Sequence, residues 1–194
     1  MIDAFSKNSN DEYIEGYLSD KENFNGVLFL LKEPNTNDGE QESFWFKDGL
    51  EGKIPNSKSK RVHTLYKNKF EQLLDYIGFS GISSCAYANI IPNRGFKSES
   101  SEYKSLCEEF RYNRFKKLIE TCNPQIVFLC TKDFEAIIKI EKGKEYIEPI
   151  ENEGIQYSNN KQKRAIHYKD SKNDLRVYEI YHPGYRIRIE EKDK

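Results

Sequence analysis

Three short apolar runs stand out from an otherwise polar chain. They cover residues 27–31, 84–91 and 125–130, and the first reads Val-Leu-Phe-Leu-Leu. A continuous apolar run of this length is typical of a strand that is buried on both faces, as in a parallel sheet. Turn-forming or polar residues follow each run. The pattern therefore predicts three buried strands, the first of which opens into a polar loop at its carboxyl end.

In the segments between these runs, apolar residues recur at helical intervals. Tyr66, Phe70, Leu73, Leu74 and Ile77 recur at helical intervals, which predicts an amphipathic helix over 63–77. Similar spacing predicts a long helix over roughly 102–121 and a short one near 134–138. The last part of the chain, 164–168 and 175–181, favours a hairpin around the polar turn 170–174.

Strands that alternate with helices favour a mainly parallel sheet with helices on both of its faces. We therefore expect a three-layer α/β/α fold with a central, mainly parallel, four-stranded sheet. A chain of 194 residues is the size of one domain, 1–194. Within it, the charged residues 1–24 are expected to form a helix or a loose lead-in. The polar residues 141–162 are expected to form an exposed excursion.

Polar side chains gather at three of the expected strand ends. Glu33 follows the first strand, Asn89 to Asn93 close the second, and His182 follows the last. Open α/β sheets bind their ligands outside the carboxyl ends of the strands. We therefore predict that these residues converge on one crevice.

The charge of the chain does not by itself indicate a partner. Thirty-one basic residues face 32 acidic ones, so the net charge of -1 gives no argument for non-specific nucleic-acid binding. Two local clusters differ from this average. The first, between Lys53 and Lys69, contains no acid, and the second runs from Lys161 to Lys172 with Asp170 as its one acid. Either cluster could also be an ordinary solvated surface.

The cysteines and the hydropathy predict a reduced setting away from membranes. The four cysteines include no C-x-x-C pair, and three lie in apolar runs, so we expect buried, reduced thiols. Residues 1–12 lack the apolar core of a signal peptide. No apolar run approaches the roughly 18 residues of a membrane span. These features predict a cytoplasmic protein.

Five features occur in an order that resembles the uracil-DNA glycosylase superfamily. They are an acid before proline after the first strand (Glu33), an aromatic residue thirteen positions later (Phe46), a proline loop (54–57), an asparagine in the second strand (Asn89) and a final His-Pro (His182). Each dipeptide alone is common, so the order of all five carries the resemblance. It covers roughly residues 26–188.

The resemblance implies an enzyme that hydrolyses the N-glycosidic bond of uracil or another modified base in DNA. Glu33 would stabilise the positive charge on the sugar and orient the attacking water. His182 would donate a hydrogen bond to the base carbonyl and so stabilise the departing anion. The base itself would be held by Lys32, Asn35, Phe46 (with Phe44 as its neighbouring alternative) and Asn89.

The resemblance also implies the partner and the surface that holds it. The substrate would be DNA with a single-stranded or flipped-out nucleotide, bound by a monomer that needs no metal and no organic cofactor. The expected contacts to the DNA backbone are Pro55, Ser57, Lys58, Lys60, Arg61, Gly184 and Arg186, most of them in a basic loop from Lys53 to Arg61. The cysteine pair of the iron–sulfur branches is absent near the start of the sequence, so we expect no cluster.

Several departures from the family keep other functions open. Leu31 stands where most branches have glycine, Glu33 where most have Asp, Asn or Ala, and Gly184 where the family has serine. The segment after the final motif is short, and we expect no closing helix there. A module that binds a base without hydrolysis therefore remains an alternative, as does a nucleoside or nucleotide hydrolase acting on small molecules. Glu33, Asn89 and His182 also have ordinary structural explanations: a solvated acid, a structural amide and a strand-end hydrogen bond.

Overall fold

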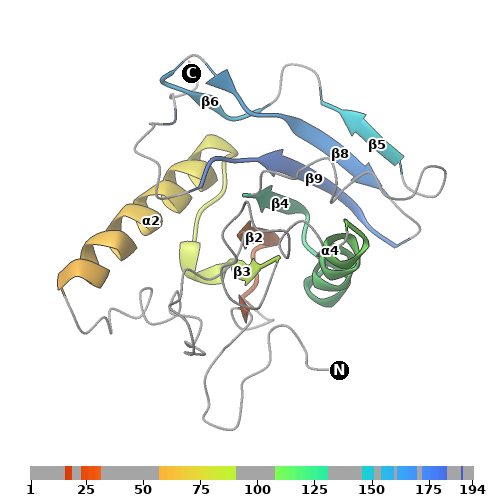
Figure 1. Ribbon diagram of the computed structural model, residues 1–194, viewed down its shortest axis with the longest axis horizontal. Coiled ribbons are helices and arrows are strands. Elements are labelled where there is room, and N and C mark those ends of the chain that lie inside the picture. The colour runs from red at the N-terminus through yellow and green to blue at the C-terminus, as the bar shows by residue number, and fades with distance from the viewer. Residues whose placement is uncertain are drawn as a thin grey trace, which may run out of the picture.

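A computed structural model describes a mixed α/β fold (Figure 1). The expected α/β class is confirmed. The described residues form one seven-stranded sheet, a separate two-stranded hairpin and two α-helices. They are residues 16–18, 23–31, 57–90, 108–130, 146–150, 154–159, 161–169, 172–182 and 189.

Four neighbouring strands form a parallel core in the order β3-β2-β4-β9. Their bounds are Val27–Leu31 for β2, Ala86–Asn89 for β3, Ile126–Leu129 for β4 and Asp174–Glu179 for β9. Every residue of β2, β3 and β4 is buried. Burial on both faces explains why these strands are apolar without alternation. The three predicted buried strands are confirmed.

Antiparallel strands extend both edges of this core. On one side β1 (Gly16–Leu18) pairs with β3, and on the other β8 (Ala165–Lys169) pairs with β9 and β5 (Tyr146–Pro149) pairs with β8. The β8–β9 pair is the hairpin that the sequence predicts.

Two of the polar segments contain short strands that the sequence does not predict. Within the lead-in 1–24, residues 16–18 form an edge strand. The excursion 141–162 contains β5 and a hairpin of β6 (Gln156–Tyr157) and β7 (Lys161–Gln162). Ile155 and Tyr157 are buried rather than exposed, with 0% and 3% of their surface accessible. Strands of two to four residues carry too few alternating positions to be recognised from sequence, because edge pairing and packing determine them.

Helix α2 (Ser57–Tyr76) begins earlier than the apolar spacing predicts, and α4 (Glu108–Cys122) is described from residue 108. Ser57, Lys58, Lys60 and Arg61 therefore lie in the first turns of α2, not in a loop. Lysine and arginine are good helix formers, so the helix continues past its last apolar residue toward the amino end. A 3-10 turn, η1 (Ile82–Ser84), leads into β3.

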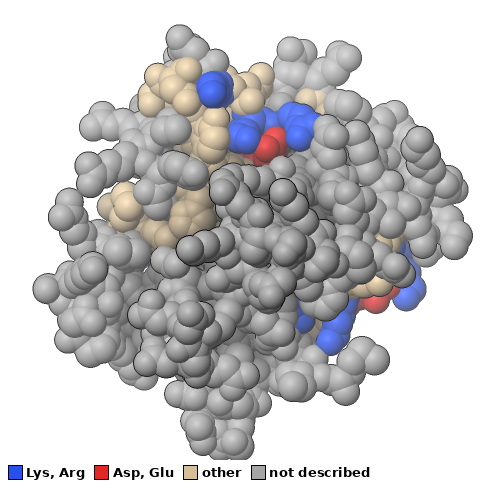
Figure 2. Space-filling view, viewed as in Figure 1, with Lys and Arg blue, Asp and Glu red and all other residues tan. Residues whose placement is uncertain are grey.

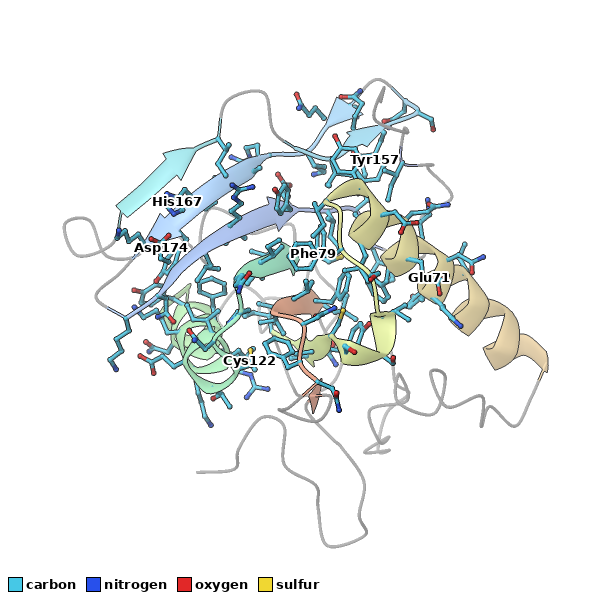
Figure 3. The ribbon with its side chains drawn as sticks, turned by 180° about the vertical axis from the view of Figure 1, so that it is seen from behind. Glu71, Phe79, Cys122, Tyr157, His167 and Asp174 are labelled. Atoms are coloured by element: carbon cyan, nitrogen blue, oxygen red, sulfur yellow. The ribbon has the colours of Figure 1, made fainter. Side chains whose placement is uncertain are left out.

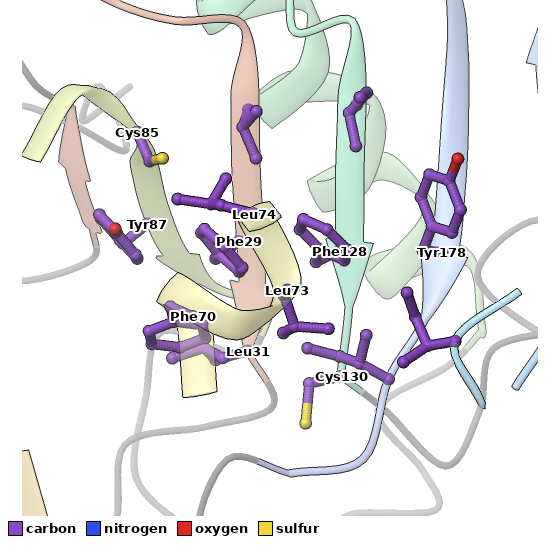
Figure 4. Close-up of a cluster of buried hydrophobic side chains, with 14 of the residues drawn as sticks. Phe29, Leu31, Phe70, Leu73, Leu74, Cys85, Tyr87, Phe128, Cys130 and Tyr178 are labelled. Atoms are coloured by element: carbon purple, nitrogen blue, oxygen red, sulfur yellow. The ribbon is translucent and has the colours of Figure 1, made fainter. Parts of the chain in front are cut away.

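The side chains of α2 pack on one face of the sheet around Phe29 (Figure 4). The ring centroid of Phe29 lies 4.3 Å from that of Phe70 on α2, 5.3 Å from that of Tyr87 on β3 and 4.9 Å from that of Phe128 on β4. Phe29 thus joins three strands and one helix. This cluster includes alternate residues of each strand, as the pleat requires.

Helix α4 packs on the opposite face. Phe115, Leu118 and Ile119 of α4 share a buried cluster with the other set of alternate strand residues, among them Leu28 and Leu30. One helix therefore covers each face of the parallel core, and the two lie on opposite sides of the sheet in Figure 1.

Candidate functional site

The four parallel strands end at the same level. Leu31 of β2 is paired with Asn89 of β3, and the N–H of Ile90 donates to the Leu31 carbonyl at 2.7 Å. On the other side, the N–H of Cys130 donates to Leu30 at 2.8 Å and that of Ile180 to Leu129 at 3.0 Å. The segments that follow the strands therefore begin at one edge. With neighbouring strands about 4.8 Å apart, this edge spans about 14 Å from β3 to β9.

The strand order reverses in the middle of this edge. From β2 the chain passes through α2 on one face to β3, and later through α4 on the other face to β4 on the far side of β2. Open α/β sheets bind ligands outside the carboxyl ends of the strands at such a switch point. Here that point lies between β2 and β4, where the side chains of Leu31 and Cys130 belong to the α2-side cluster.

Asn89 is the last residue of β3 and retains only 5% exposure. Because side chains alternate along a strand, Asn89 is directed to the same face as Tyr87, which is the α2 face. The sequence thus places an amide at the carboxyl end of the second parallel strand, and the structure puts it on the α2 side of the candidate edge.

His182 lies two residues beyond Ile180 at the end of β9 and is exposed. Its ring meets the ring of Tyr66 on α2 at a centroid distance of 5.5 Å and an angle of 84°. This contact places His182 on the α2 side of the sheet, as Asn89 is. Burial, with a smaller effect of the neighbouring Cys130, raises the pKa of Tyr66 to about 12, so its hydroxyl stays protonated.

The β6–β7 hairpin supports the backbone that leads to His182. The Tyr157 hydroxyl accepts a hydrogen bond from the N–H of Tyr181 at 3.2 Å, and the two rings meet with centroids 4.8 Å apart at 71°. Burial raises the pKa of Tyr157 above its usual value. In Figure 3, Tyr157 lies near the carboxyl end of α2, while His167 and Asp174 lie together at the other end of β8 and β9.

Sequence reasoning missed this support because Tyr157 falls in the polar excursion. The sequence does hold a short sign of this strand, because the apolar residues Ile155 and Tyr157 alternate just after Gly154. In the structure Gly154 has a positive φ of 145°. The Tyr76 hydroxyl donates to the Gly154 carbonyl at 2.8 Å and ties the hairpin to α2.

Of the residues predicted for the site, Asn89 and His182 are brought to one edge and one side of the sheet. Ser57, Lys58, Lys60 and Arg61 belong to α2, and Arg61 precedes Tyr66 by five residues, or about 7.5 Å along the helix axis. The other members lie outside the described residues: Lys32, Glu33, Asn35, Phe46, Pro55, Gly184 and Arg186.

Three further findings concern the described part of the chain. Within it, no group of His, Cys, Asp and Glu side chains is arranged to hold a metal ion. Neither of its helices combines the length and apolar character needed to cross a membrane. Cys85, Cys122 and Cys130 are buried free thiols, as predicted, while Cys107 lies outside the described residues.

No protein-family model matches the chain, and no curated protein matches it.

Proposed function

We propose that this chain is a DNA glycosylase-like enzyme that hydrolyses the N-glycosidic bond of uracil or another modified base in DNA. We assign it to the three-layer uracil-DNA glycosylase-like fold as part of the same proposal. One observation supports this most: Asn89 ends β3 and His182 follows β9, which are the outer strands of the four-stranded parallel core, and both residues lie on the same side of the sheet. The family resemblance puts a base-reading amide at the end of an apolar strand and a base-carbonyl donor after the last strand.

The chemistry needs three groups around one nucleotide. The side-chain amide of Asn89 offers a donor and an acceptor that match the edge of a pyrimidine. His182 donates to the carbonyl of the base as negative charge develops there. Glu33 follows β2, which lies next to β3 and is separated from β9 by β4. It stabilises the oxocarbenium character of the sugar and orients the water that adds to it, while the base leaves with the bonding electrons.

Access to that bond requires the nucleotide to leave the base stack. The proposed partner is therefore single-stranded DNA or a flipped nucleotide in a duplex. In this proposal Lys58, Lys60 and Arg61, which lie in the first turns of α2, bind backbone phosphates. Tyr66 of the same helix contacts the ring of His182.

Release of free uracil from a single-stranded oligonucleotide that carries one uracil tests the proposal. We expect the wild-type chain to release the base and Glu33→Gln to lose most of the rate while still binding the oligonucleotide. A base-binding module without hydrolysis would bind the oligonucleotide and release nothing, even as the wild type.

Two measurements distinguish the proposed enzyme from a hydrolase of small molecules: which substrate releases base, and how the affinity for the substrate depends on salt. A nucleoside or nucleotide hydrolase would release base from the free nucleoside or nucleotide and leave the oligonucleotide intact. Its substrate affinity would also change little with salt, whereas affinity for DNA falls steeply as salt displaces backbone contacts.

A further inference from the structure

Strands β8 and β9 separate at the point where the candidate site begins. The N–H of Glu179 still donates to the Arg164 carbonyl at 2.8 Å, and the Glu179 carboxylate pairs with both Lys163 and Arg164. In Figure 2 basic side chains flank an acidic one over this end of β8 and β9. Because hydrogen-bonded pairs recur at every second residue of an antiparallel ladder, the next donor is the N–H of Tyr181, and its acceptor in register would be the Gln162 carbonyl. Gln162 instead belongs to β7, which pairs with β6.

A side chain takes the place of that backbone acceptor. The N–H of Tyr181 donates to the Tyr157 hydroxyl at 3.2 Å. The ring of Tyr157 also meets the ring of Tyr181, with 4.8 Å between their centroids and 71° between their planes. The path of the chain beyond β9 therefore depends on one side chain rather than on the continued pairing of two strands.

Tyr157 also contacts the chain beyond His182. Its backbone forms an isolated antiparallel bridge with Ile189, which packs partly buried against the α2-side cluster. Tyr181 and Ile189 thus both meet Tyr157, and His182 lies between them in the sequence. One residue therefore holds the chain on both sides of the proposed donor to the base.

Tyr157 is itself fixed by burial. It is only 3% exposed and belongs to the buried cluster on the α2 face of the sheet. Close to it, the N–H of Lys163 donates to the Ile155 carbonyl at 3.0 Å and closes the β6–β7 hairpin. The ring of Tyr66 on α2 meets His182 directly. His182 is therefore held by α2 through its ring and by the hairpin through its backbone.

We propose that Tyr157 is a positioning residue for His182, which it places by binding Tyr181 through its side chain and pairing with Ile189 through its backbone. Its effect on excision rests on the proposed function, in which His182 donates to the base, whereas the place of His182 does not. The Tyr157 hydroxyl acts as a neutral group, because burial raises its pKa above the ordinary value.

NMR of the histidine ring resonances, together with excision kinetics, tests the inference on the full chain. The chain has three histidines, and His182→Gln identifies the His182 resonance by its loss. Tyr157→Phe removes the hydroxyl and keeps a ring. Tyr76→Phe is the matched control, because it removes the other phenolic hydrogen bond of the hairpin, the one to the Gly154 carbonyl. Lys169→Gln, at an exposed position at the other end of β8, controls for substitution as such. Thermal unfolding shows that each variant is folded.

We expect Tyr157→Phe to move the His182 resonance, which is sensitive to the place of the imidazole beside the Tyr66 ring. The single-turnover rate of uracil release should fall by about two- to tenfold, the effect of one lost hydrogen bond. The affinity for the oligonucleotide should stay the same, whereas a merely structural loss would lower the rate and the binding together. Tyr76→Phe and Lys169→Gln should behave as the wild type. An unmoved His182 resonance in Tyr157→Phe would overturn the inference, and so would equal effects of Tyr157→Phe and Tyr76→Phe.

Exchange of the Tyr181 amide hydrogen with solvent is a second measurement, and it needs no variant. The exchange should be slow in the wild type, because the N–H is bonded to the Tyr157 hydroxyl. Exchange as fast as that of an unstructured peptide would overturn the inference.

The failure of this inference and that of the proposed function remain distinguishable. Uracil release by Tyr157→Phe at the wild-type rate would remove the positioning role and keep hydrolysis. A wild type that releases no uracil, with a His182 resonance that moves in Tyr157→Phe alone, would remove hydrolysis and keep the positioning of His182.

Discussion

The ring of Tyr66 on α2 stands edge-on to the ring of His182, with 5.5 Å between their centroids and 84° between their planes. Helix α2 and the end of β9 are thereby joined at the proposed site. His182 is exposed, so its imidazole is accessible to a ligand. The aromatic contact orients the group that we propose as donor to the base.

We expect Tyr66→Leu to lower the excision rate up to about tenfold, because an aromatic pair contributes about 0.5–1.5 kcal/mol and its removal frees the imidazole. Tyr66→Phe keeps the ring contact and should retain most of the rate. Single-turnover kinetics and oligonucleotide affinity are measured together, and the affinity should not change. Equal rates in the Leu and Phe variants would contradict a positioning role.

The β6–β7 hairpin is predicted to require glycine at position 154. A Cβ at this position would meet the Lys163 carbonyl oxygen at 2.1 Å, and φ is 145°. Gly154→Ala should therefore cost about 3 kcal/mol of unfolding free energy. Gly78→Ala is the matched control: its φ is also positive, at 75°, but nothing lies within 4 Å, so about 1 kcal/mol is expected. Urea denaturation compares the two, and similar losses would show that the clash is relieved by local movement.

Asp174 should make the stability depend on pH in the acid range. Hydrogen bonds from His167 and then Lys169 hold its pKa below the ordinary value. A lowered pKa contributes stability above the unfolded-state pKa, and that contribution is lost as pH falls through the folded-state pKa, below about pH 4. Asp174→Asn should thus be less stable than the wild type at neutral pH, and the difference should disappear in acid. A difference that persists unchanged below that range would refute this linkage.

The buried thiols should be inert in the folded protein. Burial raises the pKa of Cys85 to about 11 and that of Cys122 to about 12. The thiolate is the reactive form of cysteine, and at pH 8 only about one Cys85 side chain in a thousand is ionised. Peptide mapping after alkylation should find both cysteines labelled slowly in the native state and rapidly in denaturant. Equal labelling rates in the two conditions would count against the described packing.

The core of the fold is predictable because its information is local. The run around Phe29 is apolar on both faces, which few structures other than a parallel strand explain. Edge strands are different: β1 and β5 are short and owe their structure to pairing with β3 and β8. The early start of α2 at Ser57 is also missed, since the basic residues 57–61 include no apolar position and give no helical periodicity.

The candidate site is predictable to a similar extent. The places of Asn89 and His182 follow from parallel strands of similar length, whose carboxyl ends meet at one edge. The contact of His182 with Tyr66 does not follow, because residues more than a hundred positions apart meet only through the packing of α2 on the sheet. Glu179 between Lys163 and Arg164 likewise requires the register of the β8–β9 hairpin, which the residue pattern leaves open.

Alkaline strand scission of labelled oligonucleotides carrying one uracil, single-stranded and in duplex, tests the central proposal most directly. Base removal leaves an alkali-labile site, so scission reports hydrolysis of the N-glycosidic bond. We expect the wild type and Lys169→Gln to produce scission, and His182→Ala and Asn89→Ala to reduce it by a factor of about 100 or more. A folded wild type that yields no scission, or scission that persists in both variants, would contradict the proposal that these strand ends form the site of base excision.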